Sequence, residues 1–144
     1  MKLTTACMIA AAALVAAPAI AAEPSAAEPA KTEKEVGHHN YKTVTGEELA
    51  KLIKDKKAIV VDSRSAEDYA KGHIDGAVNL PADKVDADTL KAVSADKKAA
   101  LVFYCGNVKC PASAKSAEKA HGLGYTNVHK YPGGYEEWTE KKFM

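Results

Sequence analysis

The sequence predicts an α/β fold, a small parallel sheet with helices on both faces. Short continuous apolar runs, such as the β-branched run 58–61 and the run 99–104, are typical of strands that are covered on both sides. Segments with helical spacing separate these runs, and strands that alternate with helices form parallel sheets. We therefore expect a doubly wound sheet in one ordered domain.

Local signals predict where the elements begin and end. Thr45 and Glu48 have the spacing of a capping box, and the apolar residues that follow lie on one helical face. Ser65 opens a second, short helix that stops at Gly72. The other elements are strands expected at 58–61, 77–80, 99–104 and 127–131, and helices expected within 86–93, at 113–121 and, after Gly133 and Gly134, at 135–138.

The first 21 residues predict a secretory signal. Lys2 is their only charged residue, and an uninterrupted apolar run from Ile9 to Ala17 is followed by small residues. This run is too short to span a bilayer, which needs about 20 residues, so cleavage near Ala21 is expected. Cys7 precedes most of the run, which argues against a lipid anchor. We expect the mature protein to be exported, into a periplasm where the cell has one.

Residues 22–40 predict a flexible linker, and the ordered domain is expected at 41–144. The linker consists largely of Ala, Pro, Glu and Lys, which bury too little apolar surface to offset the entropy of ordering. His38 and His39 are adjacent, but without a further ligand type nearby they do not predict a metal site.

The charge balance argues against two classes of partner, nucleic acids and anionic membranes. Of 20 Lys and Arg residues, only Lys2 lies in the signal, so the mature chain keeps 19 basic residues against 19 acidic ones. Binding to nucleic acid or to an anionic membrane needs a basic excess or patch. We therefore expect a small molecule or another protein as partner, with no nucleic acid and no membrane after signal removal.

Cys105 is the candidate nucleophile. It directly follows an apolar strand, and a helix is expected a few residues later. Ligands of open parallel sheets collect at the carboxyl ends of the strands. This position predicts a partly exposed sulfur near backbone amides and a helix N-terminus, all of which favour the thiolate. Lys109 adds a cation to the same loop, although an ordinary solvated lysine is the other interpretation.

Several motifs together resemble the signature of the rhodanese-like family. They occur in the family's order at Val61–Arg64, Tyr69, Gly72–Pro81, Leu101–Cys105, Gly124–Val128 and Gly133–Trp138. The resemblance covers about residues 41–143. It implies a single-domain sulfurtransferase that needs no metal or organic cofactor.

The resemblance also implies roles for individual residues. Cys105 would take a sulfane sulfur from thiosulfate or a persulfide, hold it as a persulfide and pass it to a thiophilic acceptor. Backbone amides of the loop would hold the sulfur. The loop residues are Gly106, Asn107, Val108, Lys109 and Cys110, and structural support is expected from Asp62, Arg64, His73 and Trp138.

The loop departs from the family at one position. Family members commonly carry an arginine about five residues after the cysteine, where this chain has Cys110, or Ala112 if its loop is two residues longer than usual. Without a guanidinium, binding of dianionic thiosulfate is in doubt, and phosphatase chemistry is not expected. Cys110 instead suggests a thiol–disulfide or sulfur-relay role as the resolving thiol, if its α-carbon lies within about 7 Å of that of Cys105. A non-catalytic binding module is the other alternative.

Overall fold

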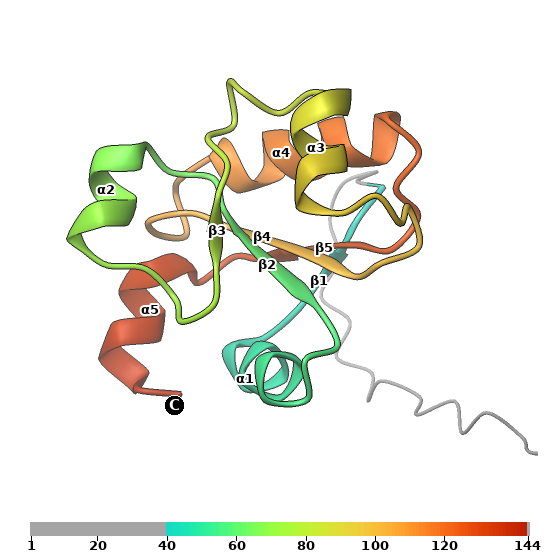
Figure 1. Ribbon diagram of the computed structural model, residues 1–144. Coiled ribbons are helices and arrows are strands. Elements are labelled where there is room, and N and C mark those ends of the chain that lie inside the picture. Colours follow the sequence, from blue (N-terminus) through green and yellow to red (C-terminus); the bar gives the residue numbers. More distant parts are fainter. Residues whose placement is uncertain (1–39, 144) are drawn as a thin grey trace, which may run out of the picture. The chain divides into compact units, whose positions relative to one another are not determined.

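The computed structural model describes residues 40–143, which form a five-stranded sheet flanked by helices (Figure 1). All strand pairs are parallel, and the strand order is β1-β5-β4-β2-β3. The predicted α/β fold is therefore confirmed. The strands are β1 (Lys42–Thr43), β2 (Ile59–Asp62), β3 (Val78–Asn79), β4 (Leu101–Tyr104) and β5 (Val128–Tyr131). The helices are α1 (Gly46–Lys54), α2 (Ala66–Lys71), α3 (Ala87–Val93), α4 (Ala112–Gly122) and α5 (Gly134–Lys141).

The predicted signal segment, nearly all of the predicted linker and the pair His38 and His39 lie outside the described residues. Export and cleavage therefore stay predictions. Within residues 40–143, no helix is both long enough and apolar enough to cross a membrane.

Helices cover the sheet on both sides. Figure 1 shows α3 and α4 on one face, and α1 and α5 on the other. Phe103 of β4 packs on the first side with Leu90 and Ala117, whereas Val102 packs on the second with Leu49. All four residues of β4 are fully buried. A central strand covered on both faces explains why its sequence is continuously apolar instead of alternating.

The N-termini of the helices are satisfied in two different ways. The predicted capping box of α1 is confirmed, since Glu48 N donates to Thr45 Oγ1 (3.3 Å) and Thr45 N donates to Glu48 Oε2 (2.8 Å). Side chains also cap α2 and α3. In contrast, α4 follows Pro111 and α5 follows Gly133, and neither residue makes a side-chain capping bond. These two helix starts flank the loop after β4.

The sequence does not predict β1. Its two residues, Lys42 and Thr43, are exposed and have no apolar pattern. They form a strand because they pair with His129 and Lys130 at the edge of the sheet. A strand formed by a tertiary contact alone leaves no local signal in the sequence.

The strand order places Cys105 at a topological switch point. From β2 the chain continues to β3, toward one edge of the sheet. From β4 it continues to β5, toward the opposite edge. The crevice between the carboxyl ends of β2 and β4 is therefore where open parallel sheets bind ligands. Cys105 is the first residue after β4.

His129 makes stability depend on pH. Burial lowers the pKa of its imidazole, and the charge of Lys42 lowers it further, while Glu48 partly opposes this. As pH falls below about 6.5, the unfolded chain takes up this proton first, so stability falls. We expect His129→Gln to flatten the decrease of the urea unfolding midpoint between about pH 7 and pH 5.5. His121→Gln, a change on the surface of α4, is the control and should keep the wild-type slope. Equal slopes for both variants would contradict the assignment.

Candidate active site

Cys105 is joined to Cys110 by a disulfide bond. The two α-carbons lie 6.2 Å apart, inside the range of roughly 7 Å that allows such a bond. Pairing of β2 with β4 continues to the edge of the site, where Ser63 N donates to Tyr104 O (2.9 Å). The structure therefore brings together the two cysteines whose contact the sequence left open.

The predicted partial exposure of Cys105 is wrong for this oxidised form. Cys105 is only 3% exposed, whereas Cys110 is partly exposed. The physical reason is that the sulfur of Cys110 is bonded to that of Cys105, while the start of α5 packs against the Cys105 backbone. An external reagent therefore reaches Cys110 more readily than Cys105.

The loop after β4 is fixed to the start of α5. Tyr135 N donates to Cys105 O (2.8 Å), and Glu136 N donates to Gly106 O (2.9 Å). These carbonyls satisfy helix amides that have no side-chain cap. Gly134 has a φ of 69°, and a Cβ there would lie 2.7 Å from Cys105 O. Only glycine permits this close approach without a shift of the backbone.

Part of the predicted amide cradle is used inside the loop itself. Cys110 N donates to Asn107 O (3.2 Å), and Lys109 N donates to Asn107 Oδ1 (3.1 Å). The expectation that all five loop amides hold the sulfur is therefore wrong for Lys109 and Cys110. The amides of Gly106, Asn107 and Val108 make no hydrogen bond to another protein group in the described part of the chain.

The start of α4 adds further free donors next to the disulfide. Cys110 directly precedes Pro111, which occupies the N-cap position of this helix and makes no side-chain capping bond. The amides of Ser113 and Ala114 have no hydrogen-bond acceptor among residues 40–143. An eleven-residue helix has a partial positive charge at this end, which favours an anion such as a thiolate or persulfide.

A buried carboxylate organises the backbone around Cys105. Asp62 is fully buried and accepts hydrogen bonds from Arg64 Nε (3.0 Å), Arg64 Nη2 (2.7 Å) and the Tyr104 hydroxyl (2.7 Å). Arg64 Nη2 also donates to Gly72 O (2.6 Å), and Ile74 N donates to the Tyr104 hydroxyl (3.1 Å). The end of β2, the end of β4 and the turn before β3 are thereby tied together.

The hydroxyl of Tyr104 and the guanidinium of Arg64 both have raised pKa values and keep their protons. Burial raises the pKa of Tyr104, and its hydrogen bond to Asp62 raises it further, so the hydroxyl remains a donor. Burial alone would lower the pKa of Arg64, but the hydrogen bond and charge of Asp62 raise it above its ordinary value. The guanidinium of Arg64 therefore stays charged through the physiological pH range.

Arg64 lies beside the cysteine loop without offering it a free charge. Its side chain passes 3.8 Å from the position that a Cβ on Gly106 would occupy, and its guanidinium lies 4.5 Å from the centre of the Tyr135 ring. Asp62 neutralises the guanidinium at the same time. Arg64 does not replace the arginine that the loop lacks.

His73 and Trp138 lie away from the cysteines. His73 is exposed, stacks on Tyr69 at 3.8 Å between ring centres, and its Nδ1 lies 3.0 Å from Tyr69 O. Trp138 is buried on the α5 side of the sheet, next to Tyr131 and Phe143. Within the described chain, no hydrogen bond or ring contact joins either side chain to residues 105–110.

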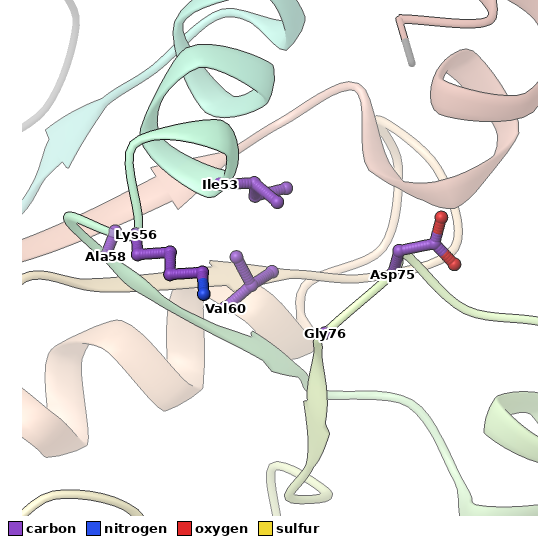
Figure 2. Close-up of a pocket in the computed structure, with 6 residues that line it drawn as sticks. All are labelled: Ile53, Lys56, Ala58, Val60, Asp75 and Gly76. Atoms are coloured by element: carbon purple, nitrogen blue, oxygen red, sulfur yellow. The ribbon is translucent and has the colours of Figure 1, made fainter.

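A separate cavity of about 390 Å³ lies at the other end of the sheet (Figure 2). Its lining residues come from the end of α1, from β2 and from the turns that precede β2 and β3. Cys105, in contrast, follows the carboxyl end of β4. Figure 2 shows the carboxylate of Asp75 pointing away from Lys56. The cavity is lined by Ile53, Lys56, Ala58, Val60, Asp75 and Gly76.

Sequence reasoning missed two residues that position Cys105. In the sequence, Tyr104 is one more apolar residue of a strand. No neighbouring residue indicates that its hydroxyl bridges Asp62 and the backbone of Ile74. Gly134 left a weak signal, since a helix that starts at two glycines has no capping side chain of its own. Such a start suggests that another part of the backbone satisfies the helix.

The fold and site define an open parallel α/β domain with a cysteine loop at the switch point. The pattern of the Rhodanese-like domain family matches residues 45–141. The chain is 35% identical over 98 residues to a thiosulfate sulfurtransferase GlpE of Pseudomonas putida (strain GB-1), which covers 68% of this chain and 84% of that protein. It is 34% identical over 111 residues to the human thiosulfate:glutathione sulfurtransferase, over 69% of this chain and 95% of that protein.

Solved structures agree with these sequence matches. The BH2092 protein of Bacillus halodurans has a TM-score of 0.65 and 32% identity, over 72% of this chain and 74% of that chain. The human single-domain sulfurtransferase TSTD1 has a TM-score of 0.59 and 31% identity, over 69% of this chain and 96% of that chain. The protein belongs to the rhodanese-like family.

Removal of the buried negative charge should destabilise the domain strongly. In Asp62→Asn the Arg64 guanidinium loses its counterion while remaining largely buried, and breaking such a pair costs about 3 kcal/mol or more. Urea unfolding measures the loss. Asp68→Asn breaks the exposed pair with Lys71 and should change the midpoint little. An unchanged midpoint for Asp62→Asn would show that the network is not needed for stability.

A methyl group on Gly134 should push the cysteine loop away from α5. Gly134→Ala forces a positive φ on alanine, at about 1–2 kcal/mol, and places its Cβ against three backbone atoms of residues 105–107. We expect a lower unfolding midpoint and, in the reduced protein, faster alkylation of Cys105 by iodoacetamide. Gly122→Ala is the control, because its Cβ would meet open space. Identical behaviour of the two variants would contradict the docking of the loop.

Proposed function

We propose that this protein is a rhodanese-type sulfurtransferase whose nucleophile is the reduced thiol of Cys105. The observation that carries the proposal is the position of Cys105 at the carboxyl end of the central parallel strand, on a loop that is fixed by α5 and followed by α4. Relatives named as sulfurtransferases are 34–35% identical to this chain over the aligned residues, and the family match over residues 45–141 includes this loop.

The reaction has two steps. The Cys105 thiolate attacks the sulfane sulfur of a donor, so that a new S–S bond forms and the bond to the donor breaks, releasing sulfite from thiosulfate or a thiolate from a persulfide. An acceptor thiolate or cyanide then attacks the outer sulfur and restores the Cys105 thiolate. The free amides of Gly106, Asn107 and Val108, with the start of α4, are available to stabilise the persulfide anion.

The charges around the loop favour a persulfide donor over thiosulfate. Thiosulfate is a dianion, and Arg64 is neutralised by Asp62. Lys109 is the remaining cation within the loop, and it is exposed to solvent, where a single lysine contributes little. A persulfide group itself carries at most one negative charge, so the reacting end of such a donor needs no guanidinium clamp.

Loading with sulfur tests the proposal. Protein reduced and freed of reductant is exposed to glutathione persulfide, polysulfide or thiosulfate, and a brief exposure is read by intact mass spectrometry. We expect the Cys110→Ser variant, which cannot form the internal disulfide, to gain one sulfur, with glutathione persulfide more effective than thiosulfate. The added sulfur should be absent from Cys105→Ser, because the nucleophile is missing.

The non-catalytic binding module gives a different result in the same experiment. If Cys110→Ser gains no sulfur from any donor although its Cys105 thiol is shown to be free by alkylation, the sulfurtransferase proposal is wrong. Sulfur gained equally by Cys105→Ser would remove Cys105 from the reaction.

A further inference from the structure

We infer that Cys110 is the internal acceptor that discharges the Cys105 persulfide, so that the protein releases hydrogen sulfide and is then reset by an external dithiol. The inference rests on the proposed function, because it requires that Cys105 first takes up a sulfane sulfur. It adds the fate of that sulfur, the role of the second cysteine and the chemical class of the reductant.

The backbone holds the two cysteines close by contacts other than the disulfide. Cys105 is fixed by the hydrogen bond from Tyr135 N to its carbonyl. The chain then reverses in a turn closed by Cys110 N and Asn107 O, and reinforced by Lys109 N and Asn107 Oδ1. Because none of these bonds involves sulfur, we expect the short distance of 6.2 Å between the α-carbons to persist in the reduced protein.

The discharge step balances without an added oxidant. The Cys110 thiolate attacks the Sγ atom of the Cys105 persulfide in its protonated form. An S–S bond forms between the two cysteines, the bond from Sγ to the outer sulfur breaks, and the outer sulfur leaves with its proton as hydrosulfide. The two cysteine sulfurs together lose two electrons, and the sulfane sulfur gains them. The product is the disulfide that the structure contains.

Differences in exposure direct the reductant to Cys110. Cys105 is 3% exposed, and Cys110 is partly exposed beside an exposed loop tip, residues 107–109. An incoming thiolate therefore attacks Cys110 Sγ and expels the Cys105 thiolate. The second thiol of a dithiol then attacks the mixed disulfide, which frees Cys110 and leaves the reductant as a disulfide.

Val108 makes the loop tip suitable for contact with a protein. It is 68% exposed and lies between two exposed polar residues, only two positions from Cys110. Such an apolar side chain next to a reactive disulfide is available to a dithiol protein that approaches Cys110. A disulfide that closes just five positions of sequence constrains the unfolded chain less than one that closes a long loop, so stabilisation of the fold is a weaker reason for it.

A single-turnover experiment tests the discharge step. Reduced wild type, Cys110→Ser and the control Ala112→Ser are mixed with one equivalent of glutathione persulfide, and sulfide and protein mass are followed. Wild type and Ala112→Ser should release about one sulfide per chain and end as the disulfide without added sulfur. Cys110→Ser should keep its persulfide at least about tenfold longer, because intramolecular attack is lost.

The outcomes separate the two proposals. If Cys110→Ser is loaded with sulfur but discharges as fast as wild type, the internal acceptor is overturned while the sulfurtransferase proposal stands. A persulfide found on Cys110 of the wild type, with no sulfide released, would also overturn it, since the outer sulfur would then have been transferred intact. If Cys110→Ser takes up no sulfur, the proposed function itself fails.

Peptide mapping tests the route of reduction. The oxidised wild type is treated briefly with glutathione, quenched with acid and alkylated, and trypsin cleavage after Lys109 then places the two cysteines on separate peptides. We expect glutathione on Cys110 and the alkyl group on Cys105, and release of both thiols by dithiothreitol. Glutathione found mainly on Cys105 would overturn the assignment of Cys110 as the point of attack.

Discussion

The architecture around Cys105 depends on the need to compensate one buried negative charge. Asp62 is removed from water entirely, and an isolated carboxylate in that position would cost several kcal/mol. Its partners are drawn from different segments: Arg64 from the residues after β2 and Tyr104 from the end of β4. Compensating the charge therefore also fixes the residue that precedes Cys105.

The loop itself is stabilised by backbone contacts instead of side chains. The carbonyls of Cys105 and Gly106 take the place of a capping residue for α5, and Gly134 allows the two backbones to touch. The arrangement leaves the side chains of residues 107–109 exposed. Because the tip contributes few buried contacts, its sequence can vary without loss of the fold, while the path of the backbone stays fixed.

The sequence was sufficient for most of the fold because the signals involved are local. The capping box at Thr45, the apolar run of β4 and the position of Cys105 after it each follow from neighbouring residues. The features that it could not predict depend on contacts between distant segments. β1 exists only through pairing with β5, and the hydroxyl of Tyr104 acts only because Asp62 lies beside it. The low exposure of Cys105 likewise follows from its bond to Cys110 and from the approach of α5.

The residue five positions after Cys105 determines what the loop can recognise. An arginine there would offer two parallel hydrogen bonds and a full charge to an anionic donor. Cys110 offers neither. Arg64 is near the loop, but its charge is neutralised by the ion pair with Asp62. Recognition of a donor is then left to backbone amides, which distinguish anions poorly by charge, so the selectivity of the loop has to arise at a later step. A second sulfur within reach of the first supplies such a step, because the disulfide can close only when Cys105 carries a leaving group bonded through sulfur, such as a sulfane sulfur.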